Sequence, residues 1–200
     1  MQDMHLALHG LAIKKHGTPA EVAAVVGLDA ARVEALLTDA VARGRAVANQ
    51  GKYLLTPTAR MALDGEYSRY YGKLRGNAAY LAANEAFERV NVALKSLITD
   101  WQTLDIGGEK VPNDHSDEAH DGRCIDRLGA LHERADKVFA SLAEQLPRLQ
   151  IYRDKLLVAL EKAEDGAHEW VSDVRIDSYH TVWFELHEDL LRIAGRERVE

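Results

Sequence analysis

Residues 16–60 constrain the fold of this chain most strongly, because helix start and stop signals follow one another closely there. Thr18 is a candidate helix cap, with Pro19 at the first helical position and Glu21 three residues after the cap. This spacing is a capping box, in which side chains at both ends bond the free backbone amides. Apolar residues follow at helical spacing, and Gly27 is placed to end the helix.

A second helix and a two-stranded wing are predicted after this glycine. Asp29 is the expected cap, Gly44 the expected stop, and the inward face carries Val33, Leu36, Leu37 and Val41. Residues 47–48 predict a short strand, residues 49–51 a tight turn and residues 53–55 the returning strand. Thr56-Pro57 then opens another helix. The order helix, helix, wing, helix predicts a winged helix-turn-helix.

The segment leaving the wing, LLTPTAR at residues 54–60, carries a family resemblance. With Leu55, Thr56 and Arg60 it is similar to the winged helix-turn-helix of MarR-type transcriptional regulators, over about a third of the chain. The resemblance implies DNA binding by a homodimer, with the second helix of the motif in the major groove and the wing beside the phosphate backbone.

The residues expected to contact double-stranded DNA are polar or basic side chains of this motif: Arg32, Arg43, Arg45, Asn49 and Lys52. Arg32 suits guanine or phosphate, and the others suit phosphates. Residues 1–62 carry a net charge of +2, so the remainder carries −9. A slightly basic head on an acidic body is compatible with DNA binding confined to the head. Asp29 and Glu34 would face phosphates unfavourably, which leaves open a winged helix used for protein interaction.

The fold class predicted is mainly α, with a winged-helix domain at residues 1–65 and a helical bundle at residues 66–200. A hydrophobic content of 46% supports a buried core, and 28% charged residues of both signs argue against disorder. The single cysteine excludes internal disulfides. We see no apolar run of transmembrane length and no signal peptide, and we expect a cytoplasmic protein.

The body is expected to form about four long helices, because apolar residues recur there at spacings of three and four. These helices are expected at residues 77–104, from about 116 to Pro147, at 148–165 and at 177–194. Residues 64–76 are expected to be a junction, for which a helix with a bend is one form, and residues 105–115 a loop. Near the N-terminus, residues 3–16 predict an amphipathic helix in which His5 and His9 are exposed.

Two stretches, residues 113–121 and 177–189, are rich in histidine and acids. They contain His115, Asp117, His120 and Asp121, then His180 and His187. Such side chains bind divalent metals, but their spacing matches no known closed zinc pattern. The competing interpretation makes them helix caps and packed residues. We expect no metal, no cofactor and no enzyme activity, because no nucleotide motif is present and Cys124 lacks a matched local base.

The body also suggests a small-molecule site, since large aromatic faces with polar tips are typical of ligand cavities. The expected ligand-binding residues are Arg127, His132, Arg148, Tyr152, Tyr179, His180, Trp183 and His187. A carboxylate-bearing effector would suit the arginines. The alternative is a purely structural body used for dimerisation.

A second resemblance concerns the runs DRLGALHERA (126–135), LPRL (146–149) and DSYHTVWFELHEDLL (177–191). They resemble helical modules that accompany winged-helix segments in actinobacterial proteins, some attached to phosphoenolpyruvate-utilising, dikinase-like enzymes. This implies a regulatory or sensory module without phosphotransfer chemistry. The sequence therefore predicts a homodimeric, ligand-responsive transcriptional regulator. The alternative is a regulatory protein-interaction module without sequence-specific DNA binding.

Overall fold

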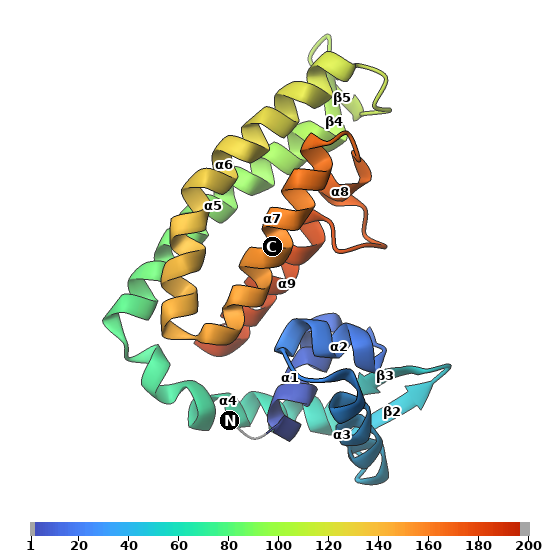
Figure 1. Ribbon diagram of the computed structural model, residues 1–200, viewed down its shortest axis with the longest axis vertical. Helices are drawn as coiled ribbons and strands as arrows, with labels where there is room; N and C mark the ends of the chain where they lie inside the picture. The colour runs from blue at the N-terminus through green and yellow to red at the C-terminus, as the bar shows by residue number, and fades with distance from the viewer. Residues whose placement is uncertain (1–2, 197–200) are drawn as a thin grey trace. The chain divides into compact units, whose positions relative to one another are not determined.

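The computed structural model describes residues 3–196, and this part of the chain is mainly helical (Figure 1). Its elements in order are α1 (Asp3–Lys14), β1 (His16–Gly17), α2 (Pro19–Val26), α3 (Ala30–Ala42), β2 (Ala46–Asn49), β3 (Lys52–Leu55), α4 (Pro57–Arg75), α5 (Ala78–Gln102), β4 (Thr103–Ile106), β5 (Glu109–Pro112), α6 (Glu118–Gln145), the 3₁₀ turn η1 (Pro147–Leu149), α7 (Gln150–Glu164), α8 (Glu169–Ser172) and α9 (Tyr179–Ala194). The predicted fold class is confirmed: a winged helix-turn-helix with a small β wing, and a helical bundle.

The chain divides into two compact units. The first contains the described residues of Met1–Asn77 together with those of Glu185–Glu200, and the second is Ala78–Phe184. This division differs from the expected domains at residues 1–65 and 66–200. Two features account for the difference: α4 continues without a break to Arg75, and the second half of α9 bonds to α1.

The helix ends of the first unit follow from local side-chain chemistry. Thr18 and Glu21 form the complete predicted capping box, and Gly27 ends α2 in the left-handed conformation at φ 73°. Asp29 caps α3 by accepting hydrogen bonds from the amides of Ala31 and Arg32. The inward face of α3 is narrower than predicted: Val33, Leu37 and Ala40 are buried, Leu36 is half-buried, and Val41 is exposed.

The wing contains one more strand than the sequence predicts. β2 and β3 form the expected antiparallel hairpin, and the two-residue strand β1 pairs with the other edge of β3, giving the order β1-β3-β2. Gln50 and Gly51 both have positive φ, at 50° and 77°, as a tight primed hairpin turn requires. Thr56 caps α4, and its hydroxyl donates to the carbonyls of Gly44 and Arg45.

The prediction that His5 and His9 are exposed is wrong. α1 is buried along most of its length, with His5 2% and His9 0% exposed. A helix covered on nearly every side shows no polar face, so its histidines need internal partners. The junction expected at residues 64–76 is helical and continues α4 to Arg75, with Tyr67 and Tyr71 buried.

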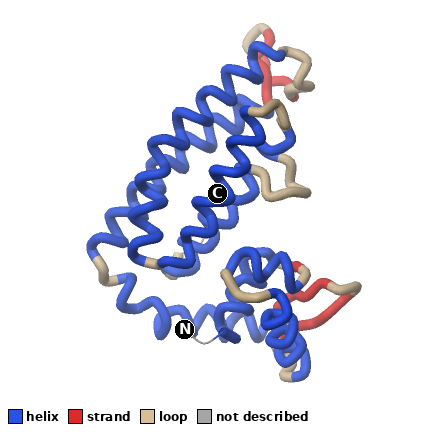
Figure 2. The backbone as a smooth tube through the Cα atoms, in the orientation of Figure 1, coloured by secondary structure: helices blue, strands red, loops and turns tan. Residues whose placement is uncertain are grey.

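In the second unit, the long helices α5 and α6 pack along each other (Figure 1). Residues 105–115, expected to be a loop, belong largely to a β-hairpin, in which β4 and β5 pair through a turn at Gly107 and Gly108 (Figure 2). Both glycines have positive φ, so the turn is of the kind that joins two strands directly. The expected interruption at Pro147 is confirmed as η1.

The core of the second unit is aromatic. Trp183 stacks on Phe87 at 4.9 Å between ring centroids and meets Phe139 edge-on at 5.5 Å. Its indole N–H donates to Oδ1 of Asn91 at 3.0 Å, which satisfies the polar edge of the ring inside the core. No helix within residues 3–196 is long and apolar enough to cross a membrane.

Candidate functional site

The candidate DNA-reading element is α3, which the buried residues Val33, Leu37 and Ala40 hold against the head. Its opposite face is exposed and carries mainly small side chains: Ala30, Ala31, Ala35 and Thr38. Arg32 lies among them with its side chain 56% exposed, and its Nε and Nη2 atoms each lie 3.1 Å from Oδ2 of Asp3. The exposed face of α3 therefore consists mainly of small side chains, with one basic side chain near the N-terminal end of the helix.

The other expected DNA contacts lie at the wing and at the end of α3. Asn49 and Lys52 face each other across the hairpin and are exposed. Arg43 ends α3 and is 69% exposed, paired with Asp39 at 2.8 Å. Arg45 is different, because its side chain is only 28% exposed and bonds Glu66 of α4 at 3.2 Å. Four of the five expected residues are thus available at the surface of the head.

The expected ligand residues of the body do not line one cavity. Tyr152, Tyr179 and Trp183 are 0–2% exposed and belong to the packed core. Burial raises the pKa of Tyr179, so this hydroxyl remains protonated and can donate to Nδ1 of His132 at 3.1 Å. Burial lowers the pKa of His132, which favours the neutral ring that accepts this bond.

The remaining expected ligand residues have separate surroundings. Arg127 is 51% exposed and pairs with Asp100 at 2.9 Å, while Arg148, His180 and His187 are half-buried with partners of their own. His180 belongs to the second unit and His187 to the first. A cleft of about 580 Å³ does occur on the second unit, but of the eight expected residues only His132 lines it, with Glu133, Asp136, Gln150, Arg153, Asp154 and Leu157.

The polar stretch at residues 113–121 forms a hydrogen-bonded helix start. Asp117 caps α6 by accepting from the amide of His120. Asp121 is buried and bonds both Nδ1 of His115 and Nδ2 of Asn113 at 2.8 Å. Within residues 3–196, no group of three or more histidine, cysteine or acidic side chains is arranged to hold a metal ion.

Cys124 does not have the surroundings of a nucleophile. Its Sγ atom lies 3.6 Å from Nε2 of His120, but that nitrogen already bonds the carbonyl of Asp100 at 2.8 Å. The nitrogen must donate to this carbonyl, so it cannot also accept the thiol proton. Burial raises the pKa of the thiol, which disfavours the reactive thiolate.

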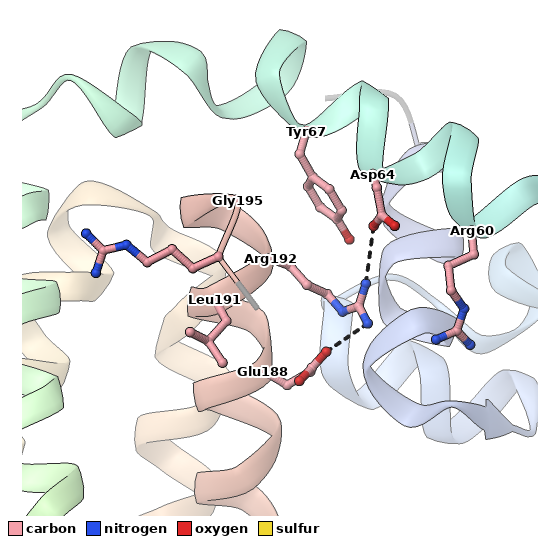
Figure 3. Close-up of a pocket in the computed structure, with 8 residues that line it drawn as sticks. Arg60, Asp64, Tyr67, Glu188, Leu191, Arg192 and Gly195 are labelled. Carbon is pink, nitrogen blue, oxygen red and sulfur yellow. Dashed lines mark ion pairs between the residues drawn. The ribbon is translucent and has the colours of Figure 1, made fainter. Parts of the chain in front are cut away.

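Sequence reasoning missed a buried polar network in the first unit. Nε2 of His9 lies 2.9 Å from Oδ1 of Asp189, and its Nδ1 lies 2.8 Å from the hydroxyl of Tyr67. Tyr67 in turn bonds Arg192, which pairs with Glu188 at 2.7 Å and Asp64 at 3.5 Å (Figure 3). The one available signal was the pair of histidines on a helix otherwise rich in apolar residues.

A cleft of about 460 Å³ opens beside this network, between α4 and the end of α9 (Figure 3). Its lining residues are Arg60, Asp64, Tyr67, Glu188, Leu191, Arg192, Gly195 and Arg196. All of them belong to the first unit.

The chain matches no protein-family model, no curated protein and no solved structure.

Proposed function

We propose that this protein is a DNA-binding transcriptional regulator that uses its winged helix-turn-helix, as the resemblance to MarR-type regulators implies. The observation that carries the proposal is the exposed face of α3, where Arg32 lies among small side chains, together with the exposed Lys52 of the wing. A helix of 13 residues is about 20 Å long and fits the major groove. Small side chains let its backbone approach the base edges closely.

The phosphate contacts would come from exposed cations around α3. Arg32 and Arg43 are each paired with a carboxylate, at 3.1 and 2.8 Å. Such exposed pairs contribute about 0–1 kcal/mol, so a phosphate can displace the carboxylate at little cost. Lys52 is exposed at the wing, where a winged helix meets the neighbouring backbone.

The experiment is a binding titration of genomic fragments at several salt concentrations, with protein variants. If a dimer contacts about six phosphates, the logarithm of the binding constant should fall with the logarithm of salt at a slope of about −5. Lys52→Ala should make that slope shallower by about one unit per protomer, and Arg32→Ala should weaken binding further and relax sequence preference. Lys110→Ala, an exposed hairpin lysine of the second unit, is the matched control and should change nothing.

One observation favours a second candidate, a winged helix that binds protein. Asp29, Glu34 and Asp39 lie on or beside α3, so this face has no net positive charge. The looser resemblance to helical regulatory modules supports the same alternative. If the folded protein shows no DNA binding at low salt, the DNA proposal fails and the interaction module becomes the better account.

Dimer formation and an effector complete the proposal. A two-fold dimer would place two copies of α3 on successive half-sites, which light scattering and half-site spacing can test together. An effector specific for the folded state must raise the melting temperature, so a thermal-shift panel tests ligand response. A monomer at all concentrations and unchanged melting across the panel would contradict these two parts.

A further inference from the structure

We propose that the cleft between α4 and the end of α9 binds a small organic oxyanion through a carboxylate or phosphate group. The cleft volume of about 460 Å³ lies within the range of small-molecule sites. The proposal concerns a surface other than α3 and the wing. It therefore does not depend on whether the head binds DNA.

The guanidinium groups of Arg60 and Arg192 carry the proposal. Arg60, Arg192 and Arg196 line the cleft against two carboxylates, Asp64 and Glu188, so the lining has a net charge of +1. The side chains of Arg60 and Arg196 form no hydrogen bond or ion pair with any residue of the described chain, 3–196. Guanidinium groups bind carboxylate and phosphate in planar, two-bond geometry, and the guanidinium of Arg60 is available for such a ligand.

Arg192 is the fixed member of the set. Its side chain is 15% exposed, and Figure 3 shows its guanidinium held between Asp64 and Glu188. Burial opposes its charge, but Tyr67 and Glu188 more than offset this and raise the pKa of the guanidinium. Its Nε atom is buried without a hydrogen-bond partner, which leaves one strong donor unsatisfied. A small rotation of the Arg192 guanidinium would bring this donor onto a ligand oxygen. The ion pair with Asp64 would oppose that rotation only weakly, because Asp64 is 56% exposed and lies at 3.5 Å.

Two features that would repel an anion are neutralised. The C-terminal end of α9 carries partial negative charge, but Arg75 binds the carbonyl of Ile193 at 2.6 Å and packs against Gly195. Tyr67 also faces the cleft, and burial raises its pKa, so the phenol carries no charge. The ring of Tyr67 and the side chain of Leu191 add apolar surface, which suits the carbon skeleton of an organic acid.

The test is calorimetric titration of the full-length protein with inorganic phosphate and with citrate, without DNA. Removing one charge-assisted bond should weaken binding about tenfold or more, so Arg60→Gln and Arg192→Gln should each raise Kd by that factor. Arg69→Gln, an exposed arginine of the same helix outside the cleft, is the matched control and should leave Kd unchanged. Binding of citrate alone or of phosphate alone supports the proposal and identifies the head group.

Two results would overturn the proposal: no heat of binding for either anion at about 10 mM, or equal weakening by Arg69→Gln. Arg192→Gln removes internal ion pairs, so its folding is checked by circular dichroism. If the Arg192→Gln protein unfolds, Arg60→Gln decides the matter, because the side chain of Arg60 has no partner within residues 3–196 to lose. Unchanged affinity in a folded Arg60→Gln protein would place the anion elsewhere.

Discussion

Replacing His9, which forms a hydrogen bond with Asp189, is the strongest test of how the first unit is held together. This bond joins α1 to α9 at 2.9 Å, and both side chains are 0% exposed. A carboxylate accepts only, so Nε2 of His9 donates to it, and Nδ1 of a neutral ring accepts from the hydroxyl of Tyr67. His9→Ala removes both bonds and opens a cavity between the two helices.

The expected cost follows from burial. Removing one partner of a buried, hydrogen-bonded charged group typically costs about 3–5 kcal/mol, because the other group remains desolvated. That is a large share of the roughly 5–15 kcal/mol by which a domain is stable. Arg32→Ala breaks an ion pair in the same unit that is 56% and 41% exposed, and there the expected cost is about 0–1 kcal/mol.

Chemical unfolding followed by circular dichroism measures the two variants against the parent protein. Hydrogen exchange of peptides from α1 and from residues 185–196 then shows whether the loss is local to the first unit. We expect faster exchange in both peptides for His9→Ala and in neither for Arg32→Ala. A His9→Ala protein within about 1 kcal/mol of the parent would refute the reasoning, because a buried carboxylate that loses this hydrogen bond stays desolvated at a cost of about 3–5 kcal/mol.

Two further predictions concern stability. A Cβ on Gly10 would lie 2.6 Å from Cγ1 of Val26, so Gly10→Ala should lower the unfolding free energy by about 1 kcal/mol or more, although alanine has the better helix propensity. Gly72 has open space around it, so Gly72→Ala should raise the unfolding free energy by about 0.5–1 kcal/mol. The denaturant midpoints of the two variants, measured against the parent protein, test both expectations. The folded-state pKa of His132 is lowered by burial, so its contribution to stability is complete above its ordinary pKa of 6.5 and is lost as pH falls below 6.5 toward the lower folded-state pKa. His132→Gln should therefore show a smaller loss of melting temperature than the parent between about pH 7.5 and about pH 5.5; an equal loss would contradict this.

The features that the sequence predicted correctly depend on neighbours within four residues. The capping box of Thr18 and Glu21, the left-handed Gly27 and the cap at Asp29 all appear as expected. Each satisfies free amides or carbonyls with a side chain or glycine close in sequence, so a short window contains the whole cause. The wing turn at residues 49–51 follows the same logic.

The hairpin formed by β4 and β5 shows how composition can mislead. The polar residues around its turn, Gly107-Gly108, predict a loop, although two glycines between short runs also suit a primed hairpin turn. The strands are four residues each and mostly exposed, so they show little of the apolar alternation that marks a half-buried strand.

The body aromatics show a different ambiguity. Tyr179 and Trp183 suit a ligand cavity or a core equally well, because each combines a large apolar face with one polar atom. The choice depends on partners far away in sequence. Asn91 accepts from Trp183 across 92 residues, and Nδ1 of His132 shares a hydrogen bond with the hydroxyl of Tyr179 across 47. No local pattern specifies those partners, so the sequence left both interpretations open.

The same limit explains the histidines of α1 and gives the first unit its particular dependence. His9 and Lys14 find their acidic partners 180 and 171 residues away, on α9. Closing so long a loop costs entropy, although that cost grows only with the logarithm of loop length. Contacts that repay it must be strong, and a buried bond at 2.9 Å together with an ion pair at 2.6 Å meets that requirement. The winged helix therefore relies on a segment that its own sequence pattern does not reveal, and substitutions in residues 185–194 should destabilise the winged helix even though they lie outside the helix-turn-helix motif.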